Sequence, residues 1–429
     1  MKPRRQKGFA LLLILTILVL TGTTVFLTVA SHGQRGNDRG TGPKNKAMKE
    51  AARAVIAYAV GSGASADRAP GALVCPDTSH PDDTVHASSG PGHQSPGSCG
   101  ANVDVVIGRL PIRTLGLDPR SADAMEEIWY AIDRSYRDRE DALPINPATS
   151  EGLTVNGTRG FAAVLILPSA PTQAQNRPST EASDYFSPVN TGVDTSLHDA
   201  DAFIDCSRVS DHDPDEPCGK GEDRTHERVI GIGIDALFDP VQRRVLQKVA
   251  RALDEYRDAN GGTLPRSAPL GSSEGQCAPD TFRGHLPVEP PLDEGTEPPG
   301  TPDPPGLPDE QCQEGEYLDY DFPVWVTDYD ETGGNDWLRF VIYHVDCDVT
   351  AASQDEALCP QDNQGLSLND QGAAAVLSGA GRPLVGQTRP GTEIEDYLDH
   401  PDNQLDDGEY FDFPLSRTDN DAFRGLQLQ

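Results

Sequence analysis

GLTVNGTRGFAAVL, residues 152–165, is the stretch that says most about the fold of this chain. Its first part alternates apolar and polar residues, and its second part is mostly apolar. Asn156 and Gly157 stand between the two parts, and this dipeptide favours the two-residue turn that joins antiparallel strands. The stretch therefore predicts a β-hairpin whose second strand, Phe161–Leu167, is buried.

This hairpin has a counterpart in the second half of the chain, GLSLNDQGAAAVL at residues 365–377. Outward from the two hairpins, other segments recur in the same order. They are a helical pattern (45–60 and 242–257), a Leu-Pro segment (107–117 and 283–292), a Trp segment (124–132 and 335–345), a Gln-x-Arg-Pro segment (175–186 and 387–398) and an acidic segment ending in Phe (199–203 and 419–423). So many matches in one order indicate an internal duplication, and a spacing of about 200 residues is too long for a solenoid.

Each copy begins with an amphipathic helix and continues through strand patterns. This order predicts an α+β fold in which each helix packs on an antiparallel sheet. A Gly-rich, polar stretch before the first helix predicts a flexible neck. The expected layout is a leader at 1–8, a transmembrane helix at 9–30, the neck at 31–43, a first repeat domain at 44–240 and a second repeat domain at 241–429.

The segment KGFALLLILTILVLTGTTVFLTVA, Lys7–Ala30, predicts the transmembrane helix. Its apolar run from Phe9 to Ala30 holds no charge and is long enough to cross a hydrocarbon core of about 30 Å. The basic residues before it place the N-terminus in the cytoplasm and the rest of the chain outside. A plain signal anchor fits this pattern, whereas a cleaved secretory signal would have a shorter apolar region.

The order of basic leader, Gly8, Phe9 and long apolar helix resembles the signal of type IV pilins and type II secretion pseudopilins. The resemblance implies that a prepilin peptidase cuts between Gly8 and Phe9 and that Phe9 is then methylated. It also implies a head in which a helix packs on a small antiparallel sheet. Most members of that family carry Glu at the fifth mature position, where this chain has Leu13. Large minor subunits at the filament tip typically lack that Glu.

We therefore expect a non-enzymatic structural protein, a minor or tip subunit of a type II secretion or type IV pilus-like filament. The expected location is the inner membrane, with a single span and a periplasmic or extracellular ectodomain. Expected partners are other pilin or pseudopilin subunits, the prepilin peptidase and the inner membrane. The alternative is an uncleaved single-pass envelope protein whose acidic ectodomain binds a protein or glycan partner.

The formal net charge of −33 bears on the possible partners. The first fifty residues are net basic, so the exported part is more acidic than the whole chain. Such a surface repels nucleic acid and anionic lipid, so nucleic-acid binding is not expected. The acidic residues form either a solvated surface or, at some clusters, calcium sites.

Eight cysteines all follow the anchor, and an even count in an exported chain predicts disulfides. No two are spaced as in a zinc site. Consecutive pairing closes short loops and respects the duplication, although the sequence leaves the connectivity open. The pairs would be Cys75 with Cys99, Cys206 with Cys218, Cys277 with Cys312 and Cys347 with Cys359.

The candidate metal site is the acidic run at 328–336, where Asp328, Asp330 and Asp336 offer oxygen ligands that suit calcium. The run is not an EF-hand, because Arg339 stands where an EF-hand needs Glu. The alternative is an acidic turn between strands. A literal G-x-S-x-G occurs at 271–275, but its flanks indicate loop rather than a strand and a helix. No other catalytic motif is present in the sequence, so an exported hydrolase is the weakest of the three functions considered.

Overall fold

A computed structural model describes the chain from the first predicted ectodomain helix onward. The described residues are 43–61, 70–78, 93–94, 99, 104–117, 127–137, 145–149, 152–187, 190, 202–207, 218, 226–270, 282–288, 318–326, 336–350, 365–405, 409–410 and 421–427, with short gaps inside some ranges. The predicted leader, transmembrane helix and neck lie outside them. Among the described helices, none combines the length and the apolar character that a membrane span needs.

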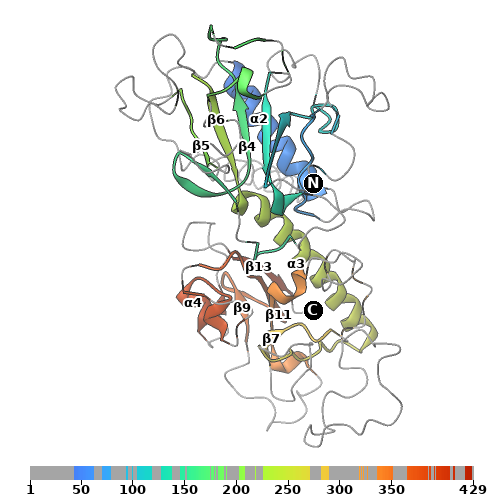
Figure 1. Cartoon of the computed structure of the whole chain (residues 1–429). Coiled ribbons are helices and arrows are strands. Elements are labelled where there is room, and N and C mark those ends of the chain that lie inside the picture. Colours follow the sequence, from blue (N-terminus) through green and yellow to red (C-terminus); the bar gives the residue numbers. More distant parts are fainter. Residues whose placement is uncertain are drawn as a thin grey trace, which may run out of the picture. The chain divides into compact units, whose positions relative to one another are not determined.

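The first half begins with helix α2, Pro43–Gly61, close to the predicted bounds (Figure 1). Met48, Ala51, Val55 and Ala59 are buried along one side of this helix. Their spacing of three and four residues places them on one face, as the periodicity predicts. This apolar face packs into the core of the protein.

A six-stranded sheet follows α2. Neighbouring strands in this sheet are antiparallel, except that β3 and β5 are parallel. The predicted hairpin is confirmed, because Asn156 and Gly157 both have the positive φ of a type I′ turn between β3 and β4. The strands are β1 Val105–Arg109, β2 Trp129–Asp133, β3 Leu153–Val155, β4 Thr158–Leu167, β5 Ala202–Phe203 and β6 Arg228–Gly233, and the 3-10 turns are η4 Arg134–Tyr136 and η5 Ala182–Asp184.

The second half is built on helix α3, Ile234–Ala259, which follows β6 directly. The helix begins earlier than the 242–257 pattern indicates, so the predicted domain boundary at 240/241 lies inside it. The later elements are β7 Arg283–His285, η8 Trp337–Phe340, β8 Val341–Val345, η9 Cys347–Val349, β9 Ser367–Leu368, β10 Gln371–Gly372, β11 Ala375–Gly379, η12 Ile394–Asp396, α4 Pro401–Gln404, β12 Glu409–Tyr410 and β13 Ala422–Leu426.

The two halves share most of their strand pairing, although the second half forms a four-stranded and a three-stranded sheet instead of one six-stranded sheet. The antiparallel order β6-β4-β2-β1 recurs as β13-β11-β8-β7, and the parallel pair of β3 with β5 recurs as β9 with β12. The single bridge of Leu73 with Arg137 recurs as Leu264 with Thr350. The α+β class is therefore confirmed, and most of the strand pairing occurs twice in the chain.

One glycine in each half shows why the repeated sequence is needed. A side-chain carbon on Gly108 would lie 2.6 Å from the backbone oxygen of Asp77, and one on Gly284 would lie 1.9 Å from that of Ala268. At both places a neighbouring loop crosses the edge strand too closely for any Cβ atom. The Leu-Pro segments of the two halves therefore match because the same backbone contact recurs.

Two of the predicted sequence matches are wrong in detail. Trp129 lies in β2, whereas Trp337 lies in η8, before the strand that corresponds to β2. The acidic segments ending in Phe also differ, because Phe203 pairs with β3 and Phe423 pairs with β11. The two matches rest on short, similar sequences. Only the strand pairing reveals which residues occupy equivalent positions in the two sheets.

The core is continuous across both halves. One cluster contains the buried faces of α2 and α3 together with the facing side chains of both sheets, such as Tyr130, Leu165, Tyr343 and Leu377. Smaller clusters fill the opposite faces of the sheets under loops. Residues Ala47–Gln429 accordingly form one compact unit.

Candidate functional site

Several of the predicted site residues lie outside the described part of the chain. They are Gly8, Phe9, Cys277, Cys312, Cys359, Asp328 and Asp330. For these residues the sequence-based assignments remain predictions.

Two of the four predicted disulfides are present. Cys75 is bonded to Cys99, and Cys206 is bonded to Cys218. Cys347 is also disulfide-bonded, and its partner lies outside the described residues. The two described bridges are the consecutive ones that the duplication favours, and they indicate an oxidising compartment for this part of the chain.

Asp336 is the one predicted calcium ligand that the structure describes. It precedes η8 in the left-handed conformation and is mostly buried. Its Oδ2 lies 2.9 Å from the Arg339 guanidinium, so this oxygen faces a cation from its own chain. Within the described residues, no group of three or more His, Cys, Asp or Glu side chains could hold a metal ion. Calcium binding at this run therefore stays a prediction.

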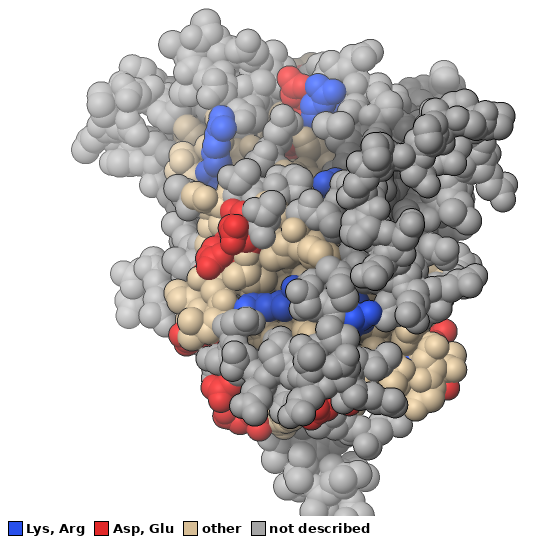
Figure 2. Space-filling model, turned by 90° about the horizontal axis from the view of Figure 1, so that it is seen from below, with Lys and Arg blue, Asp and Glu red and all other residues tan. Residues whose placement is uncertain are grey.

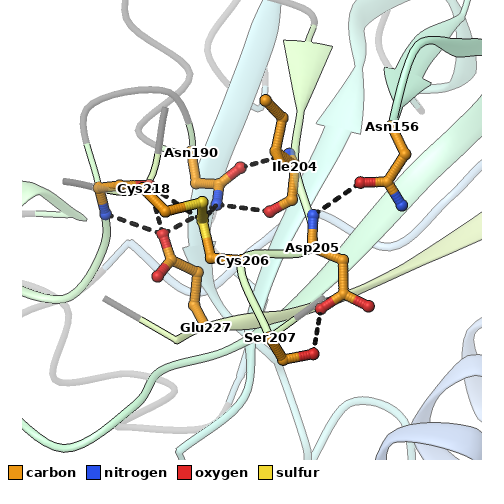
Figure 3. The surroundings of a disulfide bond; sticks show 9 residues. Asn156, Asn190, Ile204, Asp205, Cys206, Ser207, Cys218 and Glu227 are labelled. Carbon is orange, nitrogen blue, oxygen red and sulfur yellow. Dashed lines mark hydrogen bonds between the residues drawn. A yellow bond between two sulfur atoms is a disulfide. The ribbon is translucent and has the colours of Figure 1, made fainter. Parts of the chain in front are cut away.

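The Cys206–Cys218 bridge is the centre of a buried polar cluster (Figure 3). Glu227, fully buried just before β6, is its hub. Its Oε1 accepts hydrogen bonds from the Ser187 backbone N–H at 2.9 Å, from the Ser187 hydroxyl and from Asn190 Nδ2 at 2.9 Å. One carboxylate oxygen thus holds the loop that precedes the bridge.

The same cluster fixes the chain at the end of the short strand β5. Asn190 accepts from the Ile204 N–H at 2.8 Å and donates to the Ile204 carbonyl at 2.9 Å. Asn156, in the hairpin turn, accepts from the Asp205 N–H at 2.9 Å. Both sulfur-bearing residues are almost fully buried, so this cluster is suited to structural support rather than to thiol chemistry.

The second half has a counterpart of Glu227 in Asp421, which is also fully buried and lies just before the last strand. Asp421 accepts from the Gly381 N–H at 3.0 Å and from the Asp399 N–H at 2.6 Å. Sequence analysis missed both carboxylates. The available signal was an acidic residue immediately before the last strand of each half.

A stack of cations and aromatic rings covers the outer face of the first sheet. The Arg109 guanidinium lies 4.4 Å from the ring centre of Trp129 and 4.5 Å from that of Tyr185. Such contacts favour the cation over each ring face. Burial lowers the pKa of Arg109, while the hydroxyl and charge of Tyr185 oppose that change.

Arg177, on the other side of Tyr185, stabilises the turn around it. Its ring contact measures 4.7 Å. It donates to the carbonyls of Ser169, Asp184 and Tyr185, and to Gln175 Oε1. Arg177 therefore holds its own loop through backbone oxygens, as a structural arginine.

Trp129 and Trp337 are both core residues, with exposed fractions of 2% and 1%. Neither ring is available as a binding platform. Trp337 contacts the Phe238 ring at 5.7 Å, and Phe238 also contacts Tyr136 at 6.1 Å. Phe238 thus joins aromatic residues of the two halves.

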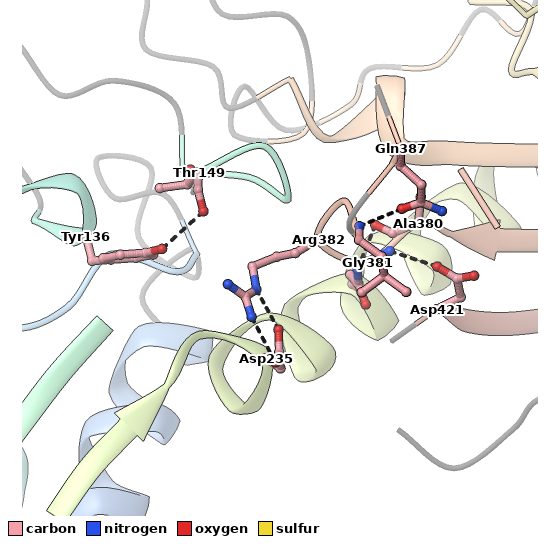
Figure 4. Close-up of polar contacts among 10 residues, drawn as sticks. Tyr136, Thr149, Asp235, Ala380, Gly381, Arg382, Gln387 and Asp421 are labelled. Carbon is pink, nitrogen blue, oxygen red and sulfur yellow. Dashed lines mark hydrogen bonds and ion pairs between the residues drawn. The ribbon is translucent and has the colours of Figure 1, made fainter. Parts of the chain in front are cut away.

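Polar contacts also fix the loop after β11 to α3 (Figure 4). Arg382 forms a two-pronged ion pair with Asp235, at 2.6 and 3.1 Å. Gln242 donates from Nε2 to the Ala380 carbonyl at 2.8 Å. These contacts hold the sheet of the second half on α3, the helix that follows β6 of the first half directly.

On the face of the molecule in Figure 2, described acidic and basic side chains are interspersed with uncharged residues. Comparison of the chain with protein families, with characterised proteins and with solved structures gives no match.

Proposed function

We propose that this chain is a non-enzymatic, membrane-anchored, exported structural protein, a minor or tip subunit of a type II secretion or type IV pilus-like filament. The observation that carries the proposal is the N-terminal order of basic leader, Gly8, Phe9 and uncharged apolar run. That order resembles the signal of pilins and pseudopilins more closely than a secretory signal, because its apolar run is long enough to span a bilayer.

The ectodomain supports this proposal in its general layout. A helix packed on an antiparallel sheet is the form of a pilin head, and here the layout occurs twice. In this proposal the two halves are tandem pilin-like heads. The bridges of Cys75 with Cys99 and Cys206 with Cys218 suit a periplasmic or extracellular location.

The proposed roles follow from this arrangement. Phe9–Ala30 would hold the protein in the inner membrane before assembly and pack against other subunits afterwards. Leu13, in place of the usual Glu, favours a tip or minor position over a major repeating one. Prepilin peptidase and other pilin or pseudopilin subunits would be the partners.

The test is N-terminal mass spectrometry of the full chain extracted from membranes, with and without prepilin peptidase. The expected product starts at N-methylated Phe9. Gly8→Leu should abolish the cut, whereas the matched Gly22→Leu, inside the apolar run, should leave it unchanged. An intact Met1 in the presence of the peptidase would reject the proposal and favour the uncleaved envelope protein with a binding ectodomain.

A further inference from the structure

A short segment of the second half covers the outer face of its sheet. This cover segment, Glu393–Asp399, includes η12. Its Ile394 and Tyr397 pack on Phe340 and Ile342, next to Ala380. The Leu398 N–H donates to the Ile394 carbonyl at 3.0 Å, which closes the turn. Leu398 and Ile394 also pack in a second apolar cluster, with Val376, Tyr410 and Phe423. The cover segment is thus held by apolar contacts on both sides of Tyr397 and by hydrogen bonds.

His285, the last residue of β7, lies against this segment. Its ring meets the Tyr397 ring edge to face, with the ring centres 5.3 Å apart. The ring has a hydrogen bond to the backbone of Val341, and its Nδ1 is buried without a hydrogen-bond partner. This geometry fits a neutral imidazole that donates from one nitrogen and keeps the other bare.

Protonation would place an N–H and a positive charge at the buried Nδ1. The nearby charges offer little relief, because Arg339 is itself a cation. Burial lowers the pKa of His285 from 6.5 to about 4, with Arg339 adding to this effect. Since an exposed ring binds its proton near pH 6.5, the closed arrangement loses stability as the pH falls from 6.5 towards 4.

We propose that His285 is an acid-sensitive latch, which holds the cover segment on the second sheet when neutral and releases it when protonated. Release would uncover the apolar side chains of Phe340 and Ile342. Other groups that hold the cover segment include Asp421, which binds the Asp399 N–H, and Gln387, which donates to the Glu395 carbonyl and to the Asp399 carboxylate. Titration of these carboxylates is a separate effect that does not require the imidazole.

The first half provides an internal reference. Arg109 occupies the place of His285, and it stacks on Tyr185 where His285 meets Tyr397. The equivalent pairs of backbone bridges, Asp77 with Arg109 and Ala268 with His285, establish this correspondence. A guanidinium stays charged at all these pH values. The contact of Arg109 with Tyr185 in the first half is therefore not a pH-dependent latch.

The experiment is hydrogen exchange of the detergent-solubilised full chain at pH 7 and pH 4.5, read at residues 394–398. At each pH, rates are compared with those of His285→Gln, which keeps a polar amide but does not titrate. Relative to this variant, opening of the wild-type segment should increase roughly fiftyfold between the two pH values. The corresponding first-half amides of Tyr185 and Phe186 should show no difference between the two proteins.

Equal pH dependence in wild type and His285→Gln would overturn the proposal. His285→Phe, which keeps a ring against Tyr397, is a second non-titrating variant and should behave like His285→Gln. If both variants misfold, an NMR titration of the wild-type imidazole decides the matter. A midpoint well below 6.5 supports the latch, and a midpoint at or above 6.5 rejects it.

Discussion

The two halves of this protein share most of their strand pairing but differ in the chemistry that holds their loops. In the first half, the loops are fixed by two disulfides, by Glu227 with three donors and by the Arg109 cation. In the second half, Cys347 is also disulfide-bonded and Asp421 accepts from the Gly381 and Asp399 N–H groups. A neutral His285 takes the place of the cation. The comparison teaches that the apolar pattern and close-contact glycines maintain the topology, while the side chains over the outer faces are free to diverge.

The two helices differ in a related way. The first turns of α3, with Ile234, Leu237 and Phe238, are buried between the halves. The stretch before α2 is Gly-rich and polar instead, GNDRGTG at 36–42. The second repeat packs against the first, so the first turns of its helix are apolar. The first repeat has no repeat before it, and the residues before its helix are polar.

The largest expected effect breaks the junction itself. Phe238→Ala removes a buried ring that contacts both Tyr136 and Trp337, and we expect a loss of about 3–5 kcal/mol in the free energy of unfolding. Urea unfolding, with hydrogen exchange of each half, measures the loss. Exchange should rise in both halves. The control Phe340→Ala should loosen the second half alone, and an identical pattern for both variants would contradict a junction role.

A second experiment removes the two disulfides of the first half, one at a time. The double variant Cys206→Ser with Cys218→Ser opens a loop of sequence separation 12, which should cost about 3 kcal/mol. The matched pair Cys75→Ser with Cys99→Ser has a separation of 24 and should cost slightly more if chain entropy dominates. Denaturant midpoints measure both. A negligible loss for either pair would show that side-chain hydrogen bonds alone hold these loops.

The buried carboxylates sharpen the comparison further. Glu227→Ala leaves the donors of Ser187 and Asn190 without that acceptor, and we expect a loss of about 2–3 kcal/mol. Asp421→Ala removes the acceptor of the Gly381 and Asp399 N–H groups. It should cost somewhat less, because Glu227 also holds the Asn190 side chain, which in turn binds Ile204. Thermal and urea unfolding of the full chain test the order. A larger loss for Asp421→Ala would mean that the disulfide already supports the Glu227 loop.

The smallest expected effect concerns the ion pair between Arg382 and the first turn of α3. The Arg382 and Asp235 side chains are 26% and 44% exposed, so solvent screens their attraction. We expect Arg382→Ala to cost about 0.5–1 kcal/mol, and less at high salt. Urea unfolding at two salt concentrations provides the measurement. A loss that does not change with salt would point to packing of the arginine stem rather than to charge.

Much of the fold follows from local sequence patterns. The turn at Asn156-Gly157, the apolar run of β4 and the periodicity of α2 and α3 each depend on neighbours in the chain, so the sequence reveals them. The pairing of Cys206 with Cys218 was also anticipated, because a short loop within one repeat closes easily. The matches of Trp337 with Trp129 and of Phe423 with Phe203 are wrong, since similar letters do not report which strands pair.

By itself, the sequence determined the α+β class, the repeated order of elements and the N-terminal signal on which the proposed function depends. These features are local, since hydrophobic periodicity and turn residues act over a few neighbours. Only the tertiary structure decided that Glu227 and Asp421 are buried hubs, that Phe238 joins the two halves and that His285 faces Tyr397. Such contacts join residues far apart in the chain, and their energies depend on burial that exists only after the sheets and helices have packed.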